Sequence, residues 1–254
     1  MIATAKNNNQ YKMSVMKKIL IAFSMMLFCT AIFAQQINDE NAEPREAKNF
    51  HALKVSNAFD VYLTQGSEEG VAVSANDPEI KQHIIVEVDG GVLIIRIEGE
   101  KKFWKAWKGN KKLKAYVSFK SLDKIAASGA CDIHLMNTLK SENLVVDFSG
   151  ASDLDGKIEI NSTLDVELSG ASDLKISGSA SQLKARLSGA CDLKGYDLVT
   201  DYCDISASGA SGVDITVNKE LSATVSGASD INYKGSGLIR DLKSSGASSI
   251  KKRS

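Results

Sequence analysis

The sequence has few aromatic residues, almost no proline and no excess of either charge. Of its 254 residues, 6% are aromatic, only 2 are proline, and 31 Lys and Arg balance 31 Asp and Glu. The shortage of proline excludes a collagen, and the zero net charge excludes a nucleic-acid binder that acts through bulk positive charge. A hydrophobic content of 43% without repeated long apolar runs excludes both a disordered chain and a polytopic membrane protein. Aliphatic and small residues must therefore fill most of the core.

One long apolar run lies near the N-terminus and is typical of an export signal. Lys17 and Lys18 precede an apolar stretch over residues 19–33, and Ala34 follows it. A positive region, an apolar stretch of about 15 residues and a small exit residue are the features of a secretory signal peptide, whereas a bilayer span needs about 20 apolar residues. We therefore predict a signal peptide over residues 1–34 and an exported protein, located in the periplasm, at the outer-membrane surface or outside the cell. The remaining 27 basic and 31 acidic residues leave a net charge of about −4.

The chain after this leader divides into a polar stretch and a long strand-like body. Residues 35–48 are polar and lack periodicity, and we expect them to form a flexible linker. We expect residues 49–254 to form a single body, with irregular coils over residues 49–120 and seven regular repeats over residues 121–254.

The tripeptide Ser-Gly-Ala recurs seven times at a near-constant spacing. Successive copies begin 21, 20, 19, 20, 18 and 19 residues apart. Five copies continue with one small residue and then Asp, and an aliphatic residue follows that position in all seven. The copies begin at Ser128, Ser149, Ser169, Ser188, Ser208, Ser226 and Ser245.

The residues before each tripeptide alternate between apolar and polar, as in Leu164, Val166 and Leu168. A period of two is typical of a strand with one buried face. A unit of 20 residues cannot bury that face alone, whereas stacked units can, each strand pairing with its equivalent about 4.8 Å away. We therefore predict an all-β, right-handed parallel β-solenoid with coils of about 20 residues, two or three short strands to a coil, and Gly-Ala at a sharp corner. The alternatives are a propeller or a stacked sandwich, whose repeats run to about 40 residues or lack this period.

The opening of the body and the repeat together resemble a known family. Residues 59–66 read Phe-Asp-Val-Tyr-Leu-Thr-Gln-Gly, and repeated Ser-Gly-Ala-Ser-Asp units follow them. This combination, after a signal peptide, resembles the head GIN-domain family of secreted proteins, which are common in Bacteroidetes and are labelled auto-transporter adhesins. The resemblance covers nearly all of residues 50–250. It implies a β-solenoid-like fold and an envelope or surface location.

The Asp of the repeat is the first candidate site. Stacked coils would align Asp132, Asp153, Asp173 and Asp192 in a column about 5 Å apart. One hypothesis is a calcium ladder, but calcium takes six to eight oxygen ligands, and a single column of carboxylates with small neighbours supplies few. The other hypothesis is an Asx-type turn, in which each Asp accepts a hydrogen bond from a nearby backbone N–H. We favour the turn, and we predict neither a metal nor a cofactor.

A lysine-rich segment that contains both tryptophans is the second candidate site. Within residues 101–112, Trp104 and Trp107 alternate with Lys105 and Lys108. Exposed Trp and Lys can stack on sugars or contact an anionic surface; alternatively, the aromatic rings fold over the solenoid flank while the lysines stay solvated. These four residues are the candidate ligand-binding residues. The expected partner is a glycan or an envelope component, with at most peripheral membrane contact and no nucleic acid.

Catalytic motifs do not stand out in the sequence. His51, His83 and His134 lack metal-ligand spacing, and no Ser lies in the motif of a hydrolase nucleophile. Solenoid polysaccharide lyases and hydrolases use paired carboxylates with basic residues, and no distinctive cluster of this kind is visible. We therefore predict a non-catalytic exported protein with an extended adhesive surface. The alternatives are a carbohydrate-active solenoid enzyme and a purely structural envelope component.

Three cysteines follow the predicted leader: Cys131, Cys191 and Cys203. An exported location favours disulfides. Cys131 and Cys191 share a repeat position three coils apart, however, which is about 14 Å at the usual strand spacing, whereas bridged Cα atoms lie within about 7 Å. Cys203 takes a position that Leu fills in neighbouring coils. The sequence therefore predicts three free thiols and no disulfide within the chain.

Overall fold

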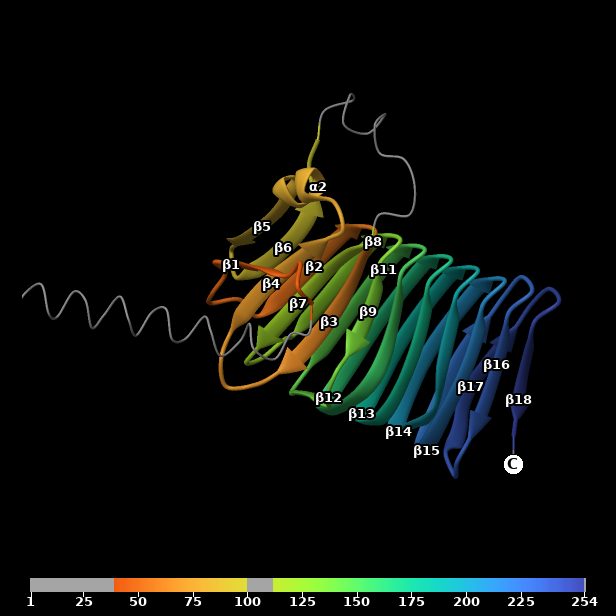
Figure 1. Cartoon of the computed structure of the whole chain (residues 1–254). Coiled ribbons are helices and arrows are strands. Elements are labelled where there is room, and N and C mark those ends of the chain that lie inside the picture. Colours follow the sequence, from red (N-terminus) through yellow and green to blue (C-terminus); the bar gives the residue numbers. More distant parts are fainter. Residues whose placement is uncertain (1–38, 100–111, 254) are drawn as a thin grey trace, which may run out of the picture.

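The computed structural model describes residues 39–99 and 112–253, whose strands form an 18-stranded sheet wound into a β-solenoid (Figure 1). Equivalent strands of successive coils pair in parallel, one repeat apart, which confirms the predicted parallel β-solenoid. Within these described residues, no helix is long and apolar enough to span a membrane. The predicted signal peptide lies outside them.

The regular coils begin with four strands and continue with longer ones. The first strands are β8 (Lys124–Gly129), β9 (Asp132–Leu135), β10 (Leu139–Ser141) and β11 (Leu144–Gly150). The middle coils are β12 (Asp153–Gly170), β13 (Asp173–Gly189), β14 (Asp192–Gly209) and β15 (Gly212–Val225). The last strands are β16 (Asp230–Lys234), β17 (Leu238–Ser244) and β18 (Ser249–Lys252). The prediction of two or three short strands is wrong for the middle coils, where strands of 14 to 18 residues form because pairing with both neighbours continues around the bend.

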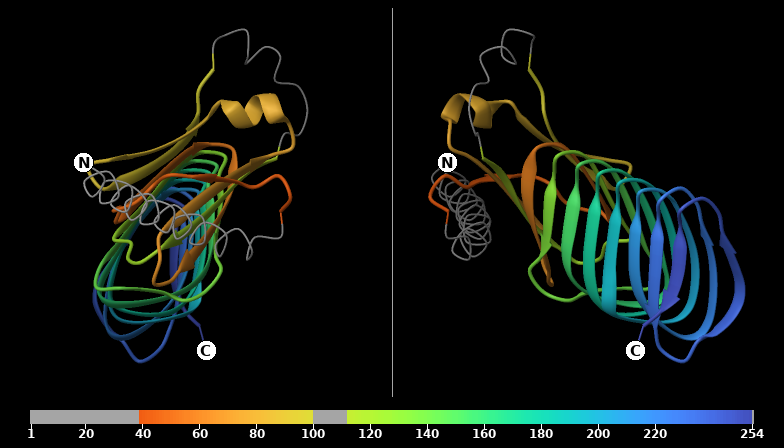
Figure 2. Two further views of the ribbon diagram at one scale, coloured as in Figure 1. Left: turned by 60° about the vertical axis from the view of Figure 1, so that its left-hand side comes forward. Right: turned by 90° about the vertical axis from the view of Figure 1, so that its right-hand side faces the viewer.

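Each coil has two walls, which Figure 2 shows as two stacks of side-by-side strands. The aspartate wall consists of β3 (Phe59–Gln65), β9, the first halves of β12 to β15, then β16 and β18. The opposite wall consists of β2 (Ala52–Asn57), β8, β11, the second halves of β12 to β15, and β17. The chain crosses from the opposite wall to the aspartate wall at the Ser-Gly-Ala corner.

Glycine is required at this corner for two reasons, which Gly170 illustrates. Its φ of 81° lies in the left-handed region, and a Cβ atom built there would stand 2.3 Å from the carbonyl oxygen of Gly150 in the preceding coil. That carbonyl accepts a hydrogen bond of 2.7 Å from the backbone N–H of Ala171. In the coil of β2 and β3 the corner residue is Asn57, with φ 80°, and Asn tolerates this region better than most residues.

The N-terminal coils are not stacked in chain order. The coil formed by β2 and β3 lies between the coil of β8 and β9 and a coil formed by β6 (Val92–Ile97) and β7 (Leu113–Phe119), which comes later in the sequence. Antiparallel strands flank this outer coil: β5 (Ile84–Asp89) on β6, and β4 (Gly70–Ala75) on β7. The helix α2 (Pro78–Gln82) joins β4 to β5.

The stretch expected to be a flexible linker is partly structured. Within residues 35–48, β1 (Glu43–Arg45) pairs antiparallel with β4, and Ala47 is buried in the core. The phenol of Tyr116 donates a hydrogen bond of 2.8 Å to the Asp39 carboxylate. The described part of this polar stretch therefore belongs to the folded body, because β4 offers it a free strand edge that the local sequence does not reveal.

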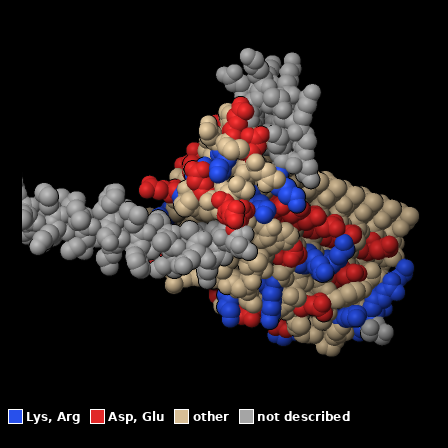
Figure 3. Space-filling model, in the orientation of Figure 1, with Lys and Arg blue, Asp and Glu red and all other residues tan. Residues whose placement is uncertain are grey.

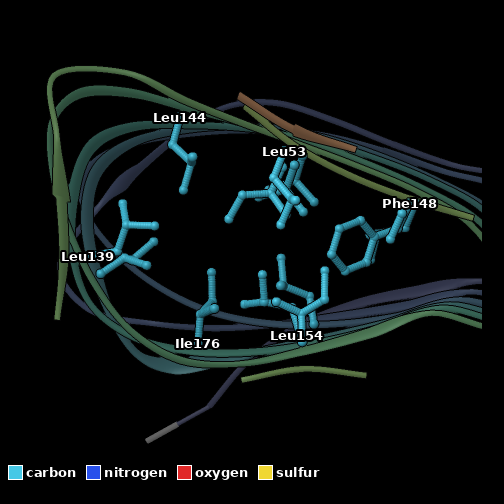
Figure 4. Close-up of a cluster of buried hydrophobic side chains, with 14 of the residues drawn as sticks. Leu53, Leu139, Leu144, Phe148, Leu154 and Ile176 are labelled. Carbon is cyan, nitrogen blue, oxygen red and sulfur yellow. The ribbon is translucent and has the colours of Figure 1, made fainter. Parts of the chain in front are cut away.

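The core lies between the two walls and follows the predicted alternation. Leu144, Phe148 and Leu154 are at most 3% exposed and point into the space between the walls, as Figure 4 shows. The equivalent residues of neighbouring coils stack in parallel register, so that each apolar column buries the next. Aliphatic side chains dominate this core, as the shortage of aromatic residues predicts.

The three cysteines of the described chain are buried and free. Cys203 pairs with Leu183 on one side and Leu221 on the other, in the apolar column that the repeat spacing assigns to it. Burial raises the pKa of its thiol to about 11, so the thiol stays protonated at neutral pH.

Candidate functional site

The aspartate wall carries a column of carboxylates from successive coils. The structure places Asp132, Asp153, Asp173 and Asp192 at equivalent positions of neighbouring coils, the alignment that the repeat spacing predicts. Asp60 pairs with Asp132 and extends the column by one coil. The Ser-Gly-Ala spacing does not predict this member, but residues 56–61 read Ser-Asn-Ala-Phe-Asp-Val, which is the repeat with Asn in place of Gly and Phe in place of the small residue.

Among the described residues, no carboxylate of this column accepts a hydrogen bond from its own turn, as an Asx-type turn would require. Asp153 accepts a hydrogen bond of 3.0 Å from the backbone N–H of Asp173, which lies one coil further along rather than in its own turn. The ammonium of Lys194 lies 3.0 Å from the Asp173 carboxylate and 3.5 Å from the Asp192 carboxylate. Burial, together with the nearby Asp60 and Asp153, raises the pKa of Asp132. Within residues 39–99 and 112–253, no group of three or more His, Cys, Asp or Glu is placed to hold a metal ion.

The corner is instead held by the small residue between Ala and Asp. The hydroxyl of Ser172 donates to the carbonyl of Ser169, at 3.2 Å, and accepts from the backbone N–H of Ser152 in the preceding coil, at 3.3 Å. Cys131 and Cys191 fill the same position with their thiols against the equivalent carbonyl oxygens. This buried ladder leaves the Asp side chains outside it available to the surface.

A second column runs beside the carboxylates and begins with aromatic rings. The rings of Tyr62 and Tyr116 stack with centroids 5.2 Å apart, and the imidazole of His134 lies 5.3 Å from the Tyr62 ring. Burial and the bond to Asp39 raise the pKa of Tyr116. The column continues with Asp155, Lys175, Lys194, Asp214 and Asn232, one residue from each coil.

This second column borders an open groove of about 690 Å³ on the aspartate wall, where β12, β13, β14 and β15 begin to bend. Three acidic and three basic side chains line it, with Gly156, Ile176, Ser177 and Tyr196 between them. The charged lining residues are Asp155, Asp197, Asp214, Lys157, Lys175 and Lys194.

A bulge in β14 shapes one side of the groove. Between two paired positions, β13 has two residues and β14 has three, so β14 carries one extra residue within the stretch from Gly195 to Asp197. The ammonium of Lys234 lies 4.7 Å from the centre of the Tyr196 ring, and Thr216 donates a hydrogen bond of 2.8 Å to the Tyr196 carbonyl. Burial and the Asp214 carboxylate raise the pKa of the Tyr196 phenol. Bulges of this kind re-aim side chains on the edges of binding sites.

The aromatic–basic candidate residues Trp104, Trp107, Lys105 and Lys108 lie outside the described residues. Their place in the chain is nevertheless defined by the strands around them. β6 ends at Ile97 and β7 begins at Leu113, so the four residues lie between these two strands in the sequence.

The stacked parallel coils, about 20 residues apart, define the chain as a β-solenoid. Residues 49–237 match the family described as "Putative auto-transporter adhesin, head GIN domain", and the chain belongs to this family. No curated protein matches the sequence.

Solved structures share the fold at low sequence identity. An adhesin-named protein of Bacteroides fragilis NCTC 9343 is 23% identical with a TM-score of 0.74, over 84% of this chain and 96% of its own. Two proteins of Parabacteroides distasonis ATCC 8503 are each 17% identical. The one named "putative lipid binding protein" has a TM-score of 0.64 over 85% of this chain and 98% of its own. The other, named an adhesin, has a TM-score of 0.62 over 84% of this chain and 96% of its own.

Proposed function

We propose that the chain is a non-catalytic, exported adhesin-type protein that binds a glycan or another envelope component through its aspartate wall. The observation that carries this proposal is the open groove beside two columns of polar and charged side chains on the outer face of the aspartate wall, one residue of each column from each coil. The names of the family and of two of the structural neighbours support an adhesive role. The predicted signal peptide supports export to the periplasm, the outer-membrane surface or the outside of the cell.

The charge pattern of the wall is suited to binding a polar polymer. Figure 3 shows basic and acidic side chains interspersed over the face in view, with no large patch of one sign. Ion pairs join neighbouring coils on both walls, such as Lys194 with Asp173 and Arg186 with Asp165. Alternating donors and acceptors at the strand spacing can bind a polymer at several equivalent points, and several weak contacts then act together.

A binding screen tests this proposal directly. The purified protein is offered to an array of glycans and, separately, to immobilised envelope fractions. We expect reproducible binding to at least one class, with no chemical change in the bound material. Failure to bind any glycan or envelope fraction would overturn the proposal and leave a structural role.

The second candidate function is that of a carbohydrate-active enzyme, which the carboxylates and lysines of the groove favour. Hydrolases use two carboxyl groups, one of which is kept protonated by burial. Asp155 and Asp197 are exposed, and the groove is open, so this condition is not met by those two residues. Release of reducing ends or of unsaturated sugars from a bound polysaccharide would show that the protein is a carbohydrate-active enzyme.

A further inference from the structure

The groove on the aspartate wall combines an aromatic ring with polar rims. Tyr196 lines it from the bulge of β14, and Gly156 lines it without a side chain, whereas the Ile176 side chain points into the core between the walls (Figure 4). Sugars present apolar C–H faces together with many hydroxyl groups, so an aromatic or aliphatic surface flanked by polar groups matches them.

The polar rims offer both hydrogen-bond donors and acceptors. Lys175 donates only, and Asp197 accepts only. Among the described residues, no ion pair or side-chain hydrogen bond involves the Lys175 ammonium or the Asp197 carboxylate, and both residues are exposed. Asp155 and Lys194, by contrast, are held by neighbours: the His134 ring lies 2.5 Å from Asp155, and Lys194 contacts Asp173 and Asp192. The groove therefore has two polar side chains that neighbours hold in place, and two unpaired ones, of which one donates hydrogen bonds and the other accepts them.

The charges of the groove do not select an anion. Its three lysines are matched by three aspartates, and the carboxylate column lies directly beside it. An acidic polymer would gain little from the lysines and would be repelled by the column at a few ångströms. A neutral molecule that is rich in hydroxyl groups is not repelled by the carboxylates. It can bind both the lysines and the aspartates, because a hydroxyl both donates and accepts hydrogen bonds.

We propose that this groove is a binding site for a neutral saccharide chain, with Tyr196 as the stacking surface and with Lys175 and Asp197 as the groups that bind hydroxyls. The inference rests on the proposed function, since it names the ligand class of the same wall. The groove crosses four coils, which is about 14 Å at the strand spacing, enough for several sugar units. Its volume of about 690 Å³ lies within the range of small-molecule sites.

The test compares a groove variant with a matched control. K175A/D197A removes one lysine of β13 and one aspartate of β14 from the groove. K184A/D204A removes the same residue types from the opposite wall of the same two strands, where Lys184 and Asp204 lie side by side. Both pairs leave the net charge unchanged. The purified proteins are titrated with neutral dextran and mannan and with acidic polygalacturonate and chondroitin sulfate.

We expect the parent protein to bind a neutral polysaccharide with an affinity that is unchanged between about 0.05 and 0.5 M NaCl. K175A/D197A should weaken this binding about tenfold, because two hydrogen bonds to charged groups are lost, while K184A/D204A should bind like the parent. Equal binding by the groove variant, or preference for the acidic polymers with a steep salt dependence, would overturn the inference and leave the proposed function standing. Binding of neither polymer class and of no envelope fraction would overturn both.

Discussion

At the residue scale, the position between Ala and Asp in each repeat is where the coil is closed. Ser152, Ser172, Ser211 and Ser229 are all at most 2% exposed, yet the described residues contain no buried side-chain oxygen or nitrogen without a hydrogen-bond partner. The small polar residue bonds to the carbonyl three residues before it and, in several coils, to the N–H of the coil before. The repeat therefore needs a side chain that is small, buried and able to donate.

We predict that S172A destabilises the protein by about 1–2 kcal/mol, since it leaves a buried carbonyl and a buried N–H without their partner. Urea unfolding measures the change. S172C is the matched variant, because Cys131 and Cys191 occupy the equivalent positions, and it should cost less than S172A. Equal stability of S172A and the parent would mean that the ladder contributes nothing.

The carboxylate column predicts a pH dependence at Asp132. Burial and the carboxylates of Asp60 and Asp153 raise its pKa above the ordinary 3.8. A carboxyl group with a raised folded-state pKa binds its proton more tightly in the folded state. Its stabilising contribution is therefore complete below the ordinary pKa and is lost as pH rises through the raised value.

D132N should accordingly raise the Tm at pH 7 by about 1–2 °C. It should leave the Tm unchanged near pH 3, where the protonated Asp132 of the parent is neutral like the Asn of the variant. Calorimetry at the two pH values measures this. D204N is the control, because Asp204 pairs with Lys184 and Ser222 rather than with carboxylates. A Tm that falls in D132N at pH 7 would show that the carboxylate stabilises the fold.

At the element scale, the regular and irregular parts of the solenoid differ in how the walls are joined. In the middle coils a tight corner leads directly into a long strand that pairs on both sides. In the outer coil, residues 98–112 stand between β6 and β7 instead. An insertion at a corner costs little, since lengthening a loop adds closure entropy only slowly.

We predict that W104A/W107A lowers binding to a glycan-coated or envelope surface while the far-UV circular dichroism stays unchanged. Trp rings at a surface stack on sugars, and neither residue belongs to a described strand. K105A/K108A separates the charge of the segment from its aromatic contribution. Unchanged binding in the tryptophan variant would assign the segment to a solvated loop.

At the scale of the whole molecule, stability is spread along the stack. Each coil contacts mainly its two neighbouring coils, and β17, the strand before the last, leaves Leu238, Ile239 and Leu242 at least 36% exposed. In such an arrangement the stability is close to a sum of the coils and their interfaces. Throughout the described solenoid, the stacked apolar side chains and the backbone pairing between coils supply this stability.

We therefore predict that EDTA leaves the Tm of the protein nearly unchanged. A metal that bound only the folded state would stabilise it in proportion to its occupancy, and its removal would lower the Tm. Thermal unfolding with and without EDTA, followed by addition of calcium, measures this. A large loss that calcium restores would identify the carboxylate column as a calcium site.

The sequence alone determined the regular part of the fold. The tripeptide spacing fixes the coil length, and the alternation before it fixes which side chains face inward, because a strand has a period of two. The corner glycines follow from the same repeat, since only Gly fits a left-handed corner against the carbonyl of the preceding coil. The Asp column and the Leu-like position of Cys203 also follow from register.

Only the tertiary structure decided the order of the first coils, the role of the small corner residue and the groove. The coil of β2 and β3 lies between two coils that come later in the chain, which depends on pairing between distant segments rather than on local pattern. β14 has one residue more than β13 beside the groove, and a repeat length of 20 rather than 19 residues does not show where in the coil that residue is placed. Long-range pairing fixes that place, because each strand must match both of its neighbours at once.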